Sequence, residues 1–168
     1  MSIITLTTDF GTKDHFVGAV KGSIYNELEE AKVIDISHQI TPFSITQTAY
    51  VLKNVYKNFP KGTIQMIGVD SEISVENKPI AILLDGQYFI GCDNGILSLI
   101  TNEIRPEKMV EITIPDPEEY QFAIRGKFIK VAGHIARGGL LEVIGMQLDR
   151  SREIVASRPF RNSEKNQI

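Results

Sequence analysis

Carboxylate side chains follow two strand-like runs, where they could bind or polarise a small polar ligand. The apolar run from Ile3 to Leu6 leads into Thr8-Asp9-Phe10-Gly11, and the run from Thr63 to Val69 leads into Asp70. In open α/β sheets, ligands collect beyond the carboxyl ends of the strands. Asp9 is therefore the first candidate for a ligand-binding carboxylate. The alternative is that Asp9 only caps the helix that follows it.

The elements that would position these side chains alternate between strand-like and helical patterns. Strands are expected at 3–6, 32–37, 63–69, 79–84, 88–91 and 109–114, and helices at 14–30, 45–59, 96–100 and 127–137. Ser44 is a plausible N-cap for the second helix, and Asp85-Gly86 predicts a hairpin turn. The fold class is α/β, a layered domain with a mainly parallel but mixed sheet flanked by helices.

Residues 1–149 are expected to form one domain, and the charged segment 150–168 a linker. The run from Pro115 to Glu119 reads as a surface loop. A net charge of -3 and a pI near 5.6 argue against a broad nucleic-acid surface.

The cysteine content, the length of the apolar runs and the N-terminal residues bear on the cellular compartment. The single cysteine, Cys92, cannot form an internal disulfide, and no Cys/His spacing suggests a zinc site. No apolar run reaches the roughly 20 residues that span a bilayer. With no leader-like start, the protein is expected to be cytoplasmic, without a membrane partner.

Several motifs, in order over nearly the whole chain, closely resemble the S-adenosylmethionine hydroxide adenosyltransferase family, the relatives of the fluorinases and chlorinases. The motifs are Thr8-Asp9-Phe10-Gly11 with Asp14, Val33 to His38 with Pro42-Phe43, Phe59 to Thr63, Val69-Asp70, Asp93 to Leu97 and Ala132 to Ala136.

The resemblance implies that the ligand is S-adenosylmethionine and that the reaction is substitution at the ribose C5′, with methionine leaving. Water would give adenosine, and halide a halogenated nucleoside. Asp9 matches the carboxylate that holds the ribose hydroxyls. Phe10, Asp14 and Phe43 match positions lining the same site, and Phe122 an aromatic near the reacting carbon. The resemblance also implies a homotrimer and no cofactor beyond the substrate.

The chain departs from this family at the water-activating positions. Hydrolytic members resemble one another in an Asp, Arg and His trio, for which this chain has Asp70, Asn77 and Ala123. Ile124 occupies the position of the halide-binding serine of the halogenating relatives. Asp70, with Asn77 and Lys78 as candidate partners, is the group expected to orient water. The β-rich C-terminal domain of the family is not represented in these 168 residues.

Two other functions fit the same residues. A non-catalytic module would bind the nucleoside or S-adenosylmethionine without turnover. A metal-dependent phosphatase or nucleotidase would require Asp9, Asp14, Asp70 and Asp93 to converge on a divalent cation, although no metal is expected from the family resemblance. His38 and His134 are expected to be hydrogen-bonded structural groups rather than catalysts.

Overall fold

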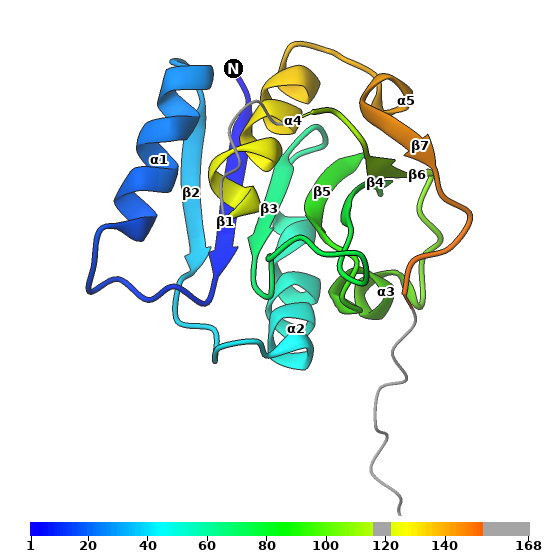
Figure 1. Ribbon diagram of the computed structural model, residues 1–168, viewed down its shortest axis with the longest axis horizontal. Helices are drawn as coiled ribbons and strands as arrows, with labels where there is room; N and C mark the ends of the chain where they lie inside the picture. The colour runs from blue at the N-terminus through cyan, green and yellow to red at the C-terminus, as the bar shows by residue number, and fades with distance from the viewer. Residues whose placement is uncertain (116–121, 153–168) are drawn as a thin grey trace, which may run out of the picture.

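A seven-stranded mixed sheet runs through the protein, as seen in a computed structural model that describes residues 1–115 and 122–152 (Figure 1). Its order is β2-β1-β3-β5-β4-β6-β7, in which β2, β1, β3 and β5 are parallel neighbours and the other pairings are antiparallel. The strands are β1 Ile3–Thr8, β2 Lys32–Ser37, β3 Ile64–Gly68, β4 Pro79–Leu84, β5 Gln87–Cys92, β6 Lys108–Ile112 and β7 Gly145–Gln147.

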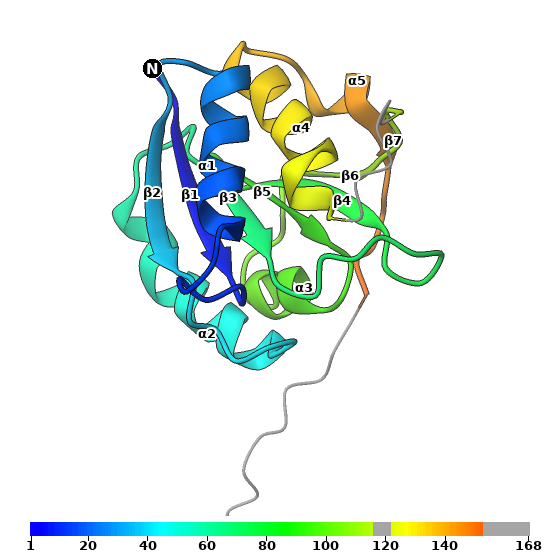
Figure 2. The same ribbon diagram turned by 60° about the vertical axis from the view of Figure 1, so that its left-hand side comes forward.

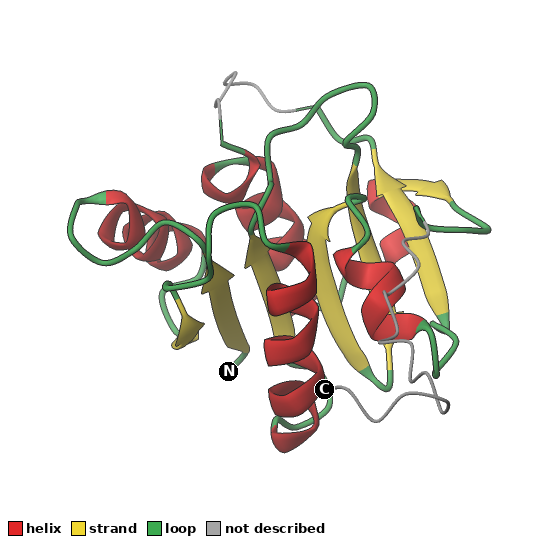
Figure 3. Cartoon of the chain, turned by 90° about the horizontal axis from the view of Figure 1, so that it is seen from below, coloured by secondary structure: helices red, strands yellow, loops and turns green. Residues whose placement is uncertain are grey.

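Helices cover both faces of this sheet, so each face has its own apolar core (Figure 3). Three helices pack on one face: α1 Phe16–Glu27, α4 Lys127–Ala136 and α5 Leu141–Ile144. Figure 2 shows α1 and α4 side by side there. On the other face lie α2 Ile45–Val55 and α3 Ile96–Thr101. Short 3-10 turns, η1 Tyr56–Asn58 and η2 Ala123–Arg125, follow α2 and precede α4. The predicted mixed sheet flanked by helices is confirmed.

Local sequence signals explain several boundaries. The hydroxyl of Ser44 accepts a hydrogen bond from the Gln47 N–H at 3.4 Å, which makes Ser44 the N-cap of α2. Asp85 and Gly86 have φ angles of 53° and 75°, as the predicted tight hairpin between β4 and β5 requires. Helix α1 is shorter than the expected 14–30 because the backbone leaves the helical region at Leu28.

Two short elements of the structure were not expected, and two expected segments lie mostly outside the described residues. Helix α5 and strand β7 were not predicted, because four and three residues carry no periodicity. Most of the expected loop from Pro115 to Glu119, and of the expected linker 150–168, lies outside the described residues. Within the two described stretches, no helix is both long and apolar enough to cross a membrane.

A chain of buried polar side chains crosses the parallel part of the sheet. The Thr5 hydroxyl donates to Gln65 Oε1, and Gln65 Nε2 donates to Gln87 Oε1 at 2.9 Å. Gln87 Nε2 then donates to the backbone carbonyls of Tyr56 and Phe59, at 2.8 and 3.0 Å. These side chains therefore tie β1, β3 and β5 to the turn that follows α2, and their donors and acceptors match.

Candidate functional site

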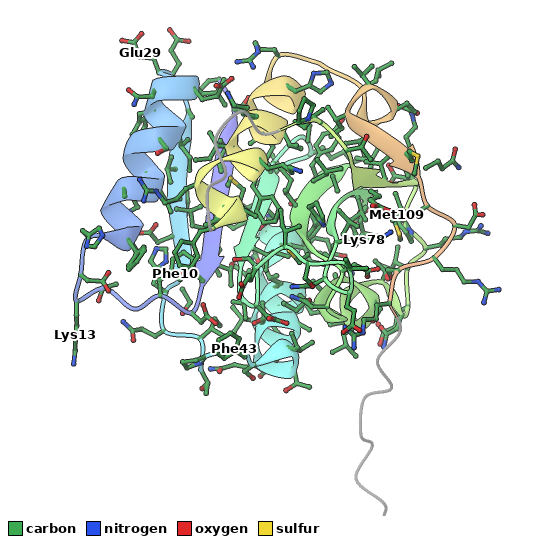
Figure 4. All side chains as sticks on the ribbon, viewed as in Figure 1. Phe10, Lys13, Glu29, Phe43, Lys78 and Met109 are labelled. Carbon is green, nitrogen blue, oxygen red and sulfur yellow. The ribbon has the colours of Figure 1, made fainter. Side chains whose placement is uncertain are left out.

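The loop after β1 is held by the loop after β2, at the carboxyl ends of both strands. Asp9 Oδ2 accepts a hydrogen bond from the Phe43 N–H at 2.9 Å, and the Gly11 N–H donates to the His38 carbonyl at 2.7 Å. Figure 4 shows Phe10 and Phe43 at the lower left, near the end of β1. The structure thus places Asp9, Phe10 and Phe43, three of the predicted binding residues, on two adjoining loops.

Aromatic rings form a wall beside this loop. Phe10 lies 6.0 Å from Phe16 and 6.4 Å from Phe122, and Phe16 lies 5.5 Å from Phe122, as measured between ring centroids. Phe122 is 37% exposed, so part of this wall faces outward. Phe16 lies within the expected helix 14–30, and nothing local in the sequence distinguishes it as a residue that also packs against Phe10 and Phe122.

Ile124 extends the apolar wall across the end of β3. A Cβ atom added at Gly68 would lie 2.5 Å from Ile124 Cδ1 and 3.4 Å from a ring carbon of Phe10. Ile124 is fully buried and therefore fills the space that a side chain at position 68 would need. At Ile124, where the resemblance implies a halide-binding serine in the halogenating relatives, the chain thus has an aliphatic group that offers no hydrogen-bond donor.

Asp70 lies at the end of β3 with a positive φ of 47°, and two asparagines hold its backbone. Its carbonyl accepts from Asn77 Nδ2 at 2.8 Å and from Asn94 Nδ2 at 3.1 Å. Asn77 Nδ2 also donates to the Glu72 carbonyl at 2.8 Å. The Asn77 amide therefore braces the 70–77 loop, and the catalytic role predicted for Asp70 stays a prediction.

The remaining predicted residues have partners elsewhere. Lys78 Nζ lies 3.2 Å from Glu111 Oε2 on β6, and Figure 4 shows it well to the right of Phe10 and Phe43. Asp14 Oδ1 accepts from the Phe16 N–H at 3.0 Å, as a carboxylate at the start of α1. Lys78 is thus directed toward Glu111, and Asp14 stabilises the start of a helix.

The four carboxylates required by the phosphatase hypothesis do not gather around one point. Asp93 Oδ1 accepts from the Arg152 N–H at 2.6 Å, Asp9 accepts from the Phe43 N–H of the loop after β2, and Asp14 accepts from the Phe16 N–H at the start of α1. In residues 1–115 and 122–152, no group of three His, Cys, Asp or Glu side chains is placed to hold a metal ion. Within the described residues, the structure therefore gives no support to a metal ion held jointly by Asp9, Asp14, Asp70 and Asp93.

Cys92 is buried at the end of β5 and should be chemically inert. Burial, together with the negative charges of Asp70 and Asp93, raises the pKa of the Cys92 thiol to about 12. Since the thiolate is the reactive form, the native protein should not react with Ellman's reagent at pH 8. After unfolding in guanidinium chloride, the thiol should react completely. Rapid labelling of the folded protein would show that Cys92 is accessible.

Phe43 has a φ angle of 62° although its side chain is 71% exposed. A left-handed backbone costs a residue with a Cβ about 1–2 kcal/mol, and asparagine tolerates it better. Phe43→Asn should therefore raise the free energy of unfolding by about 0.5–1 kcal/mol, measured by urea titration. Tyr50→Asn is the control, because Tyr50 is a similarly exposed aromatic on helix α2. Equal effects of both substitutions would contradict backbone strain at Phe43.

A hollow lies away from these loops, between the end of α3 and the β6–β7 edge. Its volume is about 930 Å³, and none of the predicted site residues lines it. Arg105, Lys108 and Arg150 line it together with Glu107 and Asp149, so its charges are mixed. This hollow therefore favours neither an anionic nor a cationic ligand.

The sheet, the acidic loop after β1 and the aromatic wall define an α/β domain of the class that binds small ligands at strand ends. A family model described as the SAM hydroxide adenosyltransferase N-terminal domain matches residues 4–145. The chain belongs to this family, as its motifs predicted.

Curated and solved relatives agree with this assignment. The chain is 40% identical, over 126 residues, to an (R)-S-adenosyl-L-methionine hydrolase of Methanocaldococcus jannaschii, covering 72% of this chain and 46% of that protein. It is 23% identical to a fluorinase of Actinopolyspora mzabensis, covering 94% of this chain and 61% of that protein. A crystal structure of an uncharacterized conserved protein from Thermotoga maritima has a TM-score of 0.83 and 30% identity, with 93% and 62% of the two chains covered. The chain thus spans less than two thirds of these relatives.

Proposed function

We propose that the strand-end loops bind S-adenosylmethionine, and that the domain belongs to an enzyme cleaving it with water to adenosine and methionine. The observation that best supports this proposal is the position of the Asp9 carboxylate. Its Oδ2 accepts a hydrogen bond from the Phe43 N–H, beside the aromatic wall. A carboxylate has two acceptor oxygens, so Oδ1 can accept from the ribose hydroxyls. The names of the hydrolase relatives support this substrate.

The proposed reaction is a displacement at the ribose C5′. The water oxygen forms a bond to C5′ while the carbon–sulfur bond breaks, and methionine leaves with the electron pair. The water proton passes to Asp70 or to solvent. Because the sulfonium loses its positive charge, low-dielectric surroundings such as the rings of Phe10 and Phe122 favour the products over a well-hydrated reactant. A homotrimer is part of the same proposal.

A second function, binding without turnover, has its own supporting observation. The Asn77 amide nitrogen donates to the carbonyls of Asp70 and Glu72, and Ala123 is buried in the apolar core. At the two positions where the resemblance places water-activating groups, the chain therefore has a loop brace and a methyl group. A general base without a partner that orients it gives a slower reaction.

One pair of measurements separates the two functions. Calorimetric titration with S-adenosylmethionine tests binding, and chromatography of the same mixture tests for adenosine and methionine. Binding with both products in equal amounts supports the hydrolase, whereas binding without products supports the module. If the protein does not bind S-adenosylmethionine or adenosine, both proposals are wrong. Light scattering of the same sample determines whether the protein is a trimer.

A further inference from the structure

A row of side chains connects the protein surface to the loop that carries Asp9. On the surface, Lys21 Nζ of α1 donates to Asp35 Oδ2 of β2 at 2.6 Å. Asp35 Oδ1 lies 3.0 Å from His38 Nε2, although not aligned for a hydrogen bond, and His38 Nδ1 lies 2.7 Å from Thr8 Oγ1. His38 is 5% exposed and Thr8 1% exposed, so the inner part of this row is dry.

The partners of His38 determine which ring nitrogen carries the proton. A carboxylate only accepts. Burial acts to raise the pKa of the Asp35 carboxyl, but its contacts with Lys21 and His38 together outweigh burial and lower that pKa below its usual value. The negative charge of Asp35, 3.0 Å from Nε2, favours the proton of a neutral ring on that nitrogen, and Nδ1 then accepts from the Thr8 hydroxyl. The Thr8 oxygen is then oriented to accept from the Phe10 N–H, which lies 3.3 Å away.

His38 also acts on the far end of the same loop. Its backbone carbonyl accepts from the Gly11 N–H at 2.7 Å, while its ring contacts Thr8, where the loop begins. Asp9 lies between these two attachment points. We propose that His38 is the positioning residue for the Asp9 carboxylate, fixing the 8–11 loop through Thr8 and Gly11. Its effect on ligand affinity rests on the function proposed for Asp9.

Asp35, His38 and Thr8 form a carboxylate, imidazole and hydroxyl series, the same types of group that act together in nucleophilic catalysis. An alternative role for Thr8 is therefore that of a nucleophile. A nucleophile must reach the substrate, but the whole Thr8 residue is 1% exposed and its hydroxyl already contacts His38 and the Phe10 N–H. The row therefore positions the loop, and Thr8 does not attack a substrate.

Three variants of the whole chain test this role by calorimetry with adenosine. Thr8→Val removes the hydroxyl with little change of shape, and His38→Leu removes the ring contact. Each should weaken adenosine binding roughly five- to tenfold, the usual effect of losing one oriented hydrogen bond. His38→Asn, whose amide oxygen can accept from Thr8 near the position of Nδ1, should restore most of the affinity. Equal losses for His38→Asn and His38→Leu would overturn the proposal.

Thr7→Val is a matched control for Thr8→Val. Thr7 is the preceding residue of β1 and is equally buried, but its hydroxyl has no hydrogen-bond partner within the described part of the chain. Thr7→Val should therefore leave the adenosine affinity unchanged. A similar loss in both variants would show a general response of the strand, which also contradicts the proposal.

Nuclear magnetic resonance provides a readout that needs no ligand. The ¹⁵N spectrum of the His38 ring should show the tautomer protonated at Nε2, and Thr8→Val should speed amide hydrogen exchange at Gly11 while Thr7→Val does not. A ring protonated at Nδ1, or unchanged exchange at Gly11, would overturn the positioning role. If these results hold but adenosine does not bind, the proposed function fails while the positioning role stands.

Discussion

Asp9→Asn is expected to weaken the binding of S-adenosylmethionine roughly ten- to a hundredfold, measured by calorimetry. Hydrogen bonds to a charged group contribute about 1.5–3 kcal/mol each, and an amide offers one acceptor oxygen in place of two. The substitution also removes the negative charge near a cationic ligand. Because asparagine is nearly isosteric and its oxygen can still accept from the Phe43 N–H, the free energy of unfolding should change little.

Asp85→Asn is the matched control for Asp9→Asn. Asp85 is exposed in the tight turn between β4 and β5, where asparagine tolerates the positive φ equally well. This turn follows the carboxyl end of an antiparallel strand, at the opposite end of the sheet from Asp9. Asp85→Asn should therefore bind the ligand as the wild type does. Unchanged binding in Asp9→Asn would remove Asp9 from the site.

Gln65→Leu is expected to lower the free energy of unfolding by about 2–4 kcal/mol, measured by urea titration at pH 7. The substitution leaves the Thr5 hydroxyl and Gln87 Oε1 without their partner in the middle of the sheet, where water cannot replace it. An unpaired buried polar group costs about 1–3 kcal/mol, and the greater apolar surface of leucine offsets part of that loss.

Two further variants test whether unpaired polar groups cause this loss. Thr5→Val combined with Gln65→Leu removes one of the orphaned groups, so the double variant should be less destabilised than the sum of the two single variants. Gln147→Leu makes the same change on the exposed strand β7 and should alter stability by less than about 0.5 kcal/mol. Simple additivity in the double variant would argue against the connected row.

Elements with a strong local signal were predicted from the sequence. The cap at Ser44 and the turn at Asp85-Gly86 depend on residues a few positions apart, and both were found where expected. Helix α5 and β7 depend instead on contacts of β7 with β6 across the chain, including the close approach of Gly145 to the Glu111 carbonyl. No local pattern reports such a contact, so these elements were missed.

The motifs selected candidate site residues, but they did not predict the contacts that connect those residues. Asp9, Phe10 and Phe43 were chosen from the motifs, yet the hydrogen bond joining Asp9 to Phe43 spans 34 positions. This hydrogen bond also requires the positive φ angle of Phe43, which the sequence does not predict. For the same reason the bracing contacts of Asn77, and the direction of Lys78 toward β6, emerged only from the fold.

The strand order β2-β1-β3 has a consequence for how this family can vary. After β1 the chain crosses to β2 by way of α1 on one face, and after β2 it returns past β1 to β3 by way of α2 on the opposite face. The direction of winding thus reverses between β1 and β3, and the connections there diverge. In open α/β sheets, ligands bind preferentially in the crevice at such a reversal point. Under the proposed function, exchanging loop residues should change which ligand is accepted, while the chain path preserves the place where it binds.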